Sequence, residues 1–327
     1  MNKLFKTTVA AIMSATTMLS AASVFADFPD MPEDETRVAL ENAVENGLLT
    51  GYETGEIKPY DKITRAQMGA IIVRALGATQ TADLSEFKDM NESQWYYDAM
   101  SKAVAMGAFQ GDGENLNPEA NITFQEAFAV IARIFDLQSS QDLDQIYLRT
   151  KKIEALPEYT STALDKYSDK DKVAEWAFPT TLAIVEGGFW APETEELRPT
   201  DYINRVEFAV LMDNLITTYI DEPGEYNVFE EGNILIRSKD VVIDNLEGEK
   251  VDIFIGDGVD GEIKLGEEIN INRIIQRGGA AKVEGGIYNQ VRVNGHNCKM
   301  DMHNTMVTTI IYGKYADAEI TNTKDVG

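Results

Sequence analysis

The feature that most constrains this fold is a segment that occurs three times in the first two thirds of the chain. Each copy begins with an aromatic residue two positions before an aspartate, and continues with an apolar stretch, a glycine, a proline and an isoleucine. The glycine-to-proline distance is 12, 11 and 12 residues, and the proline-to-isoleucine distance is 4 in every copy. These positions are Gly47, Pro59 and Ile63, then Gly107, Pro118 and Ile122, then Gly187, Pro199 and Ile203. A spacing kept in phase three times predicts one structural unit in three copies.

Within a copy, the pattern predicts a helix, a glycine stop, a loop and a second helix. The glycine can adopt a positive φ and end the first helix. Each second helix follows the spacing of a capping box, in which a short polar side chain lies three residues before a carboxyl or amide that reaches back. The pairs are Thr64 with Gln67, Thr123 with Glu126, and Asn204 with Glu207. One such hairpin of about 50 residues buries too little apolar surface to be stable alone, so the three are expected to pack as one body.

The charge balance excludes one large class of partner. With 29 Lys and Arg against 55 Asp and Glu, the formal net charge is -26, and the field of the whole protein repels polyanions. We therefore expect no nucleic-acid partner. The single cysteine, Cys298, cannot form an intramolecular disulfide, and two histidines, His296 and His303, leave little material for a metal or acid–base site. No metal, cofactor or catalytic residue is predicted.

Residues 1–26 have the pattern of a secretory signal peptide. Lys3 and Lys6 lie near the start, and an uncharged run ends in Val24-Phe25-Ala26, with small residues at the minus three and minus one positions. A membrane-spanning helix is the alternative, but the run is diluted by Ser and Thr and is followed by Asp27 rather than by a basic flank. The protein is therefore predicted to be exported, with no membrane span after cleavage.

The three copies resemble the S-layer homology domain. The resemblance depends on the aromatic-x-Asp start, a Trp at the first helix, the loop Gly51-Tyr52-x-x-Gly-x-x-x-Pro and the element Ile63-Thr64-Arg65-Ala66-Gln67. It assigns repeats to residues 27–80, 84–137 and 165–220, with a connector insertion at 138–164. It implies a three-pronged helical bundle with pseudo-threefold symmetry. It also implies noncovalent attachment to secondary cell wall polysaccharides, often carrying pyruvate ketals, outside a bacterial cell.

Two arginines are the main candidate binding residues. Arg65 and Arg205 lie just inside the second helices of copies one and three, where unpaired backbone N–H groups and the helix dipole favour an anion. A guanidinium there could hold the carboxylate of a pyruvyl group through two parallel hydrogen bonds. The alternative is a structural arginine paired with a neighbouring acid. Copy two has Phe124 at this position, so its groove is expected to lack the arginine.

The remaining candidates are two tryptophans, three aspartates and one loop. Trp95 and Trp176 could stack on a sugar ring, or fill the junction between prongs. The recurring aspartates could line a groove, or serve only as cap and turn residues. These aspartates are Asp30, Asp89 and Asp169. Gly51 and Tyr52 complete the predicted polysaccharide-binding set, and copy three has no such Gly-Tyr pair.

From residue 222 to 327 the helical period is replaced by short β-branched runs separated by Gly, Asn and Asp. The predicted strands are Ile234–Ile236, Val241–Ile243, Val251–Ile255, Arg273–Ile275, Gln290–Val293, Lys299–Met302 and Thr308–Tyr312. Such runs are typical of a parallel β-helix or a sandwich, and the Asn and Gly turns favour a short parallel β-helix. The predicted fold class is therefore α + β multidomain, with helical repeats followed by a small all-β module.

Smaller segments carry three further expectations. The connector should form a short helix at 143–155. The acids Asp252, Asp257, Asp260 and Glu262 should lie on a solvated face. Residues 256–261, Gly-Asp-Gly-Val-Asp-Gly, are expected to form a turn rather than a calcium site.

Together these features predict an exported, noncatalytic cell-surface protein of the cell wall or S-layer, anchored on polysaccharide. One alternative is a wall-anchored carbohydrate-active enzyme with its site on the β module, which would need two carboxylates facing across a cleft. The other is a self-assembling S-layer subunit. The sequence indicates no particular oligomeric state.

Overall fold

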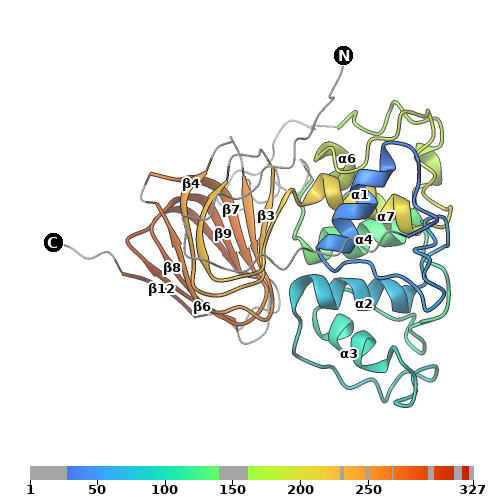
Figure 1. Cartoon of the computed structure of the whole chain (residues 1–327), viewed down its shortest axis with the longest axis horizontal. Coiled ribbons are helices and arrows are strands. Elements are labelled where there is room, and N and C mark those ends of the chain that lie inside the picture. The colour runs from blue at the N-terminus through green and yellow to red at the C-terminus, as the bar shows by residue number, and fades with distance from the viewer. Residues whose placement is uncertain are drawn as a thin grey trace, which may run out of the picture. The chain divides into compact units, whose positions relative to one another are not determined.

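The structure, a computed structural model, describes residues 28–139, 161–228, 232–246, 251–266, 268–293, 298–312 and 319–323. It consists of two compact units, a helical one that ends at Leu215 and a β unit that follows from Ile216 (Figure 1). The change of fold thus precedes the predicted start of the β module at residue 222. The signal peptide at 1–26, the helix at 143–155 and the position of His296 lie outside the described residues. None of the described helices is long and apolar enough to span a bilayer.

The described part of the helical unit contains two α-helices from each copy. They are α1 Thr36–Glu45, α2 Arg65–Leu76, α3 Tyr97–Ala105, α4 Phe124–Ile134, α6 Phe178–Glu186 and α7 Arg205–Leu215. Copy three adds two short 3-10 helices, η1 Lys170–Lys172 and η2 Glu175–Ala177. The predicted order of helix, loop and second helix is therefore present in each copy.

The helices that pack together come from neighbouring copies. Helix α3 packs on α2, α6 on α4, and α1 on α7 (Figure 1). The first helix of each copy thus lies against the second helix of the copy before it, and α1 closes the ring against α7. The prongs are shared between copies, which differs from the expected hairpin within one copy and makes the three copies mutually dependent.

A ring of three isoleucines forms the centre of this unit. The Ile63 N–H donates to the carbonyl of Ile203 at 3.1 Å, Ile122 to Ile63 at 2.9 Å, and Ile203 to Ile122 at 3.1 Å. All three side chains are fully buried. Because each copy gives one N–H and one C=O to the ring, a pseudo-threefold axis relates the copies. The constant proline-to-isoleucine distance brings the same residue of each copy to this axis.

The predicted capping boxes are confirmed. Gln67 N–H donates to Thr64 Oγ1 at 3.2 Å, and Thr64 N–H donates to Gln67 Oε1 at 3.0 Å. The same pairing links Thr123 with Glu126 and Asn204 with Glu207. Each second helix therefore begins at the residue that the sequence pattern indicates.

A glycine with positive φ ends the first helix of each copy, but in copy three it is not the glycine that was predicted. Gly47 and Gly107 have φ of 68° and 73°. In copy three, Gly187 stays helical with φ of -70°, and Gly188 adopts the left-handed conformation with φ of 72°. The assignment of Gly187 as the helix stop is therefore wrong by one residue, because helix α6 extends to Glu186 and its closing turn needs the next glycine.

The β unit is a parallel β-solenoid. Its described strands are β1 Thr218–Ile220, β2 Gly224–Val228, β3 Ile234–Ile236, β4 Val241–Leu246, β5 Asp252–Ile255, β6 Asp260–Leu265, β7 Asn270–Gln276, β8 Ala280–Glu284, β9 Ile287–Val293, β10 Lys299–His303, β11 Met306–Tyr312 and β12 Glu319–Thr323. They form two sheets, ordered β1-β3-β5-β7-β9-β11 and β12-β10-β8-β6-β4-β2, and every pairing is parallel. The predicted β-helix is confirmed, and the antiparallel sandwich is excluded.

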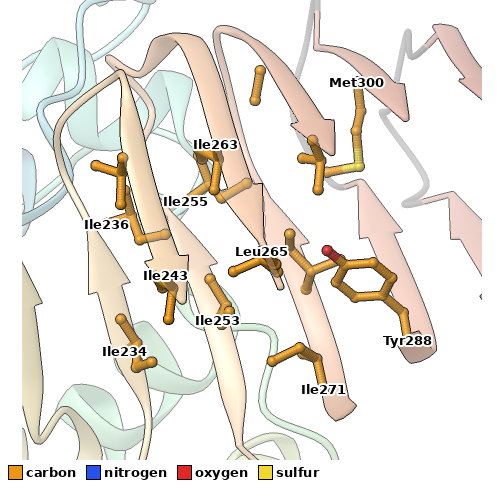
Figure 2. Packing of buried hydrophobic residues seen from close by; sticks show 14 of the residues in the cluster. Ile234, Ile236, Ile243, Ile253, Ile255, Ile263, Leu265, Ile271, Tyr288 and Met300 are labelled. Atoms are coloured by element: carbon orange, nitrogen blue, oxygen red, sulfur yellow. The ribbon is translucent and has the colours of Figure 1, made fainter. Parts of the chain in front are cut away.

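Apolar side chains fill the space between the two sheets (Figure 2). In one sheet Ile234, Ile253 and Ile274 stack in register, and in the other Val241 stacks on Ile263. All five are fully buried. Burial of one such side chain stabilises a fold by about 1.5–3 kcal/mol, so these ladders are the main source of stability in the solenoid.

Two acids do not lie on the predicted solvated face. Asp252 is buried and accepts hydrogen bonds from Arg273 Nε at 3.1 Å and Asn272 Nδ2 at 2.8 Å. Asp257 is partly buried, and burial raises its pKa despite the opposing charge of Arg277. Both corrections have the same cause, because the solenoid places these two acids where neighbouring turns cover them.

Residues 260–265 give a second correction. Asp260 begins strand β6, so the stretch expected to form a turn ends earlier than residue 261. Strand β6 alternates charged and apolar residues, and Lys264 pairs with Glu262 and Glu284 at 3.2 and 3.4 Å. Its β-branched content is low, which hid the strand from the sequence pattern.

Cys298 lies just before strand β10 and His303 ends it, and their different burial agrees with the opposite parity that their spacing predicts. Cys298 is fully buried with the core, and His303 Nε2 lies 3.0 Å from Asp301. Across the described ranges, no three His, Cys, Asp or Glu side chains come together as a metal site.

Candidate functional site

The three recurring aspartates hold the loops that lead to the second helices. The Asp30 carboxylate accepts N–H bonds from Ile57 at 2.9 Å and Lys58 at 2.7 Å. Asp89 does the same for Leu116 and Asn117, and Asp169 for Leu197 and Arg198. Burial raises the pKa of Asp30, but these backbone N–H bonds outweigh it and leave the pKa below its usual value. These contacts correspond to the turn role, because both carboxylate oxygens are occupied.

Each aspartate thus binds the backbone N–H groups of two consecutive residues, a contact that we call the aspartate clamp. The second residue of each such pair has a left-handed backbone conformation. Lys58, Asn117 and Arg198 have φ of 52°, 53° and 57°. Few residues other than glycine adopt this conformation without support, and the two bonds to the aspartate supply it. These three residues therefore occupy equivalent positions in their loops.

Arg65 reaches from copy one to the loop of copy two. Its Nε donates to the carbonyl of Leu116 at 2.8 Å, and its Nη1 lies 3.4 Å from Glu126. The guanidinium carbon lies 5.0 Å from the centre of the Phe109 ring. Burial lowers the pKa of Arg65 and nearby carboxylates raise it, but a guanidinium remains charged at any physiological pH.

Arg65 borders a pocket of about 620 Å³, which we call the second site. Its walls come from the loop at 108–117, residues 120 and 121, one side of helix α4 and Trp176 of copy three. Besides Arg65, the charged and amide side chains on these walls are Gln110, Asp112, Asn117, Asn121, Glu126 and Arg133. The pocket therefore combines cations, amides and an aromatic ring, which is a suitable lining for an acidic sugar.

Arg205 has the same position in copy three but different surroundings. Its Nε donates to the carbonyl of Ile57 and its Nη2 to that of Thr50, both at 2.7 Å. The side chain lies over the Tyr52 ring at 5.0 Å, and only 6% of the residue is exposed. Burial lowers its pKa, and the nearby Tyr52 and Asp61 side chains oppose this shift only in part. We call the place where Arg205 meets the loop at 48–58 the first site.

The helix starts themselves offer no free N–H groups of the kind the sequence suggested. Arg65 N–H donates to Ala120 and Ala66 N–H to Pro118, and the corresponding groups at α4 and α7 donate to the next copy in the same way. The expectation of an anion held by unpaired N–H groups at Arg65 and Arg205 is therefore wrong. The ring of copies uses these donors to join its members.

Gly51 and Tyr52 are brought together with Arg205. A side chain at Gly51 would meet the Phe28 ring at 2.2 Å, so glycine lets that ring close the loop. The Tyr52 ring contacts two cations. The Lys58 ammonium lies 4.8 Å from its ring centre, and the guanidinium carbon of Arg205 lies 5.0 Å from it. Both residues thus belong to the first site rather than to the second.

The two tryptophans are exposed. Trp176 is 54% exposed and lines the second site. Trp95 is 65% exposed and packs edge-on against Tyr96 at 5.5 Å. Neither side chain is buried in a junction, which favours the stacking role over the filling role for Trp176.

Phe124 replaces the arginine at the place where copy two meets the loop at 189–198, which we call the third site. It is fully buried, with its ring 4.9 Å from that of Trp190. Arg198 places its guanidinium carbon 4.7 Å from the centre of the Phe124 ring.

Several pocket residues were not found from the sequence. Phe109, Asn117 and Arg133 line the second site but lie outside the motifs that the repeats share. The helical period could have indicated Arg133, because it lies seven residues after Glu126 and therefore on the same side of α4.

Comparison with known proteins identifies the domain family of the repeats. The sequence model of the S-layer homology domain matches residues 27–68 and 86–128. The chain carries S-layer homology domains. Copy three lies outside the matched residues, but it repeats the aspartate clamp, the capping box and the ring isoleucine of the other two.

Three relatives show where such domains occur. A "Surface-layer 125 kDa protein" of Lysinibacillus sphaericus is 26% identical over 64% of this chain and 16% of its own length. An "S-layer protein sap" of Bacillus anthracis is 22% identical over 63% of this chain and 23% of its own. An "Exoglucanase XynX" of Acetivibrio thermocellus is 26% identical over 58% and 16%. The chain thus spans less than a quarter of each relative, and the S-layer likenesses indicate a cell-surface, cell-wall-associated location.

Proposed function

We propose that the S-layer homology domains hold this protein noncovalently on the bacterial cell wall through the second site. The proposed ligand is a secondary cell wall polysaccharide with acidic groups such as pyruvate ketals. The observation that supports this most is the pocket beside Arg65, which places a guanidinium, amides and the exposed Trp176 around one space.

The charge pattern supports an acidic sugar rather than a nonspecific polyanion. The two bonds of Arg65 use two of the five N–H donors of a guanidinium. The other three have no partner among the described residues and are available for a carboxylate. Because the chain as a whole carries a net charge of -26, a densely charged polymer such as a nucleic acid is repelled, whereas a single carboxylate of a sparsely charged polysaccharide meets Arg65 and Arg133 at short range inside the pocket.

We further propose that the protein is exported and noncatalytic, with the solenoid presented outward or used in assembly. Two observations support this proposal. The matched domain family implies attachment to the cell wall, and the space between the two solenoid sheets is filled by apolar side chains. Enzyme and S-layer names belong to the relatives and concern far longer chains.

Cosedimentation with purified bacterial cell walls tests the anchoring. Walls would be used before and after chemical removal of their attached polysaccharide. We expect the full chain to pellet with intact walls only, and Arg65→Gln to weaken the apparent affinity for walls about tenfold in a dilution series, as the loss of one charged contact of about 1.4 kcal/mol. Arg37→Gln, which removes an exposed arginine paired with Glu41 on α1, is the matched control. Equal pelleting by Arg65→Gln and Arg37→Gln would remove the role of the second site.

A further inference from the structure

The third site keeps a guanidinium, although Phe124 has replaced the helix-start arginine of copy two. We propose that Arg198, at the end of the loop of copy three, binds the acidic group of the wall polysaccharide there. This inference rests on the proposed function and extends it to a site that the repeat motif would dismiss.

The first step of the argument is that Phe124 occupies the place of Arg65 one copy further on. Arg65 lies over the ring of Phe109, the second residue after the glycine that ends α3. Phe124 lies against Trp190, the second residue after Gly188. The aromatic floor is therefore retained, and a phenyl ring covers it where a guanidinium does so in the second site.

The second step concerns the carboxylate beside that place. Arg65 is next to Glu126, the capping-box acid of α4. In the third site the corresponding acid is Glu207 of α7, and Arg198 Nη2 pairs with it. Arg198 therefore contacts both the residue that replaced the arginine and the acid that such an arginine would face.

The third step is the direction from which Arg198 enters. It holds the left-handed position of its loop, where copy two has Asn117, and Asn117 lines the second site. The N–H of Arg198 donates to the buried Asp169 at 2.9 Å, which fixes the backbone. The Arg198 guanidinium is thus positioned over the Phe124 ring, which in turn packs against Trp190.

Accessibility separates Arg198 from the other two arginines. Its side chain is 37% exposed, against 14% for Arg65, while Arg205 is buried. The Arg198 side chain is therefore the most open to solvent of the three. The pair with Glu207 uses one end of the planar group and leaves further donors on the exposed side.

Calorimetric titration of the full chain tests this, with a monosaccharide that carries one pyruvate ketal as the probe and the same sugar without the ketal as the ligand control. We expect Arg198→Gln to remove one binding event from the wild-type stoichiometry, and Arg65→Gln to remove a different one, so that the double variant lacks both. Arg37→Gln should leave the titration unchanged.

The outcomes separate the two proposals. If the wild type does not bind the ketal sugar, the proposed function and this inference both fail. If the wild type binds and Arg65→Gln loses a site while Arg198→Gln behaves like Arg37→Gln, only the inference is overturned. If Arg198→Gln does not fold, Arg198→Lys keeps a charge beside Glu207 without the planar fork. That variant should weaken one binding event five- to tenfold, and an unchanged titration would overturn the role of the guanidinium.

Discussion

Arg65 and Arg205 occupy the same position of the repeat, yet the structure gives them different surroundings. Arg65 shares its bonds between a carbonyl and a carboxylate at the edge of a pocket, whereas Arg205 is buried with two carbonyls of copy one. Copy three and copy one meet where the ring closes, and Arg205 joins them there. The comparison teaches that one motif residue can border an open pocket in one copy and be buried between two copies in another.

The largest expected effect is on stability, and it separates the two arginines directly. Arg205→Gln should reduce the free energy of unfolding of the helical unit by about 3 kcal/mol, because two buried carbonyls lose a charged donor. Arg65→Gln should reduce it by about 1 kcal/mol or less, since water can reach that site. Urea unfolding followed by far-UV circular dichroism measures both. Equal losses would contradict the division of roles.

The loop aspartates Asp169 and Asp89 can be compared in the same way, because one is buried and the other is half-buried. Asp169→Ala should lower the free energy of unfolding by about 2 kcal/mol, because the side chain is buried and two N–H groups lose their acceptor. Asp89→Ala, at a half-buried position, should lower it by about 1 kcal/mol, since water can replace the carboxylate. Thermal unfolding of the two variants gives the order, and a larger loss for Asp89→Ala would contradict it.

Much of the helical unit could be predicted because its helix starts depend on residues that are close together in the sequence. The capping boxes and the ring isoleucines follow from residues a few positions apart, so the helix starts were found correctly. The solenoid strands rich in isoleucine and valine were found for the same reason, whereas β6 was missed because Glu262 and Lys264 dilute its pattern.

The surroundings of the site residues could not be predicted, because they depend on which copies meet. Nothing in the sequence near Arg205 indicates that its partners are the carbonyls of Thr50 and Ile57, about 150 residues away. Likewise, the burial of Asp252 depends on how one turn of the solenoid covers the next. Contacts between distant segments thus decided which motif residues face a pocket.

The tryptophans offer a smaller test of the same contrast. Trp176→Ala should weaken binding to cell walls about tenfold, because an exposed ring at the second site would no longer cover the sugar. Trp95→Ala removes an exposed ring from copy two that does not line the second site, and should change binding less than twofold. Cosedimentation with a dilution series of walls measures both, and a reversed order would move the main binding role away from the second site.

The smallest effect concerns the acid in the second site. Hydrogen bonds from the N–H groups of Glu114 and Asn115 lower the pKa of Asp112 to about 2. Asp112 therefore stays ionised and repels an acidic sugar slightly, so Asp112→Asn should tighten binding about two- to threefold. Isothermal titration calorimetry with the ketal sugar measures this change, and weaker binding by the variant would mean that Asp112 helps to hold the ligand.

The same pKa predicts the pH dependence. Affinity should be constant between about pH 5 and pH 8, because neither the guanidinium nor Asp112 titrates there. Since the folded pKa lies below the usual value, the carboxylate form stabilises the loop above about pH 4, and this contribution is lost as pH falls toward 2. A titration series over that range checks both statements, and a midpoint near neutral pH would contradict them.

The most direct measurement is a crystal structure of the chain with the pyruvate-ketal sugar bound. The account predicts that the ketal carboxylate lies within hydrogen-bond distance of Arg65, about 2.7–2.9 Å, with the sugar ring against Trp176. Density for the sugar at Arg205 and not at Arg65 would contradict the central claim that the second site holds the wall polymer.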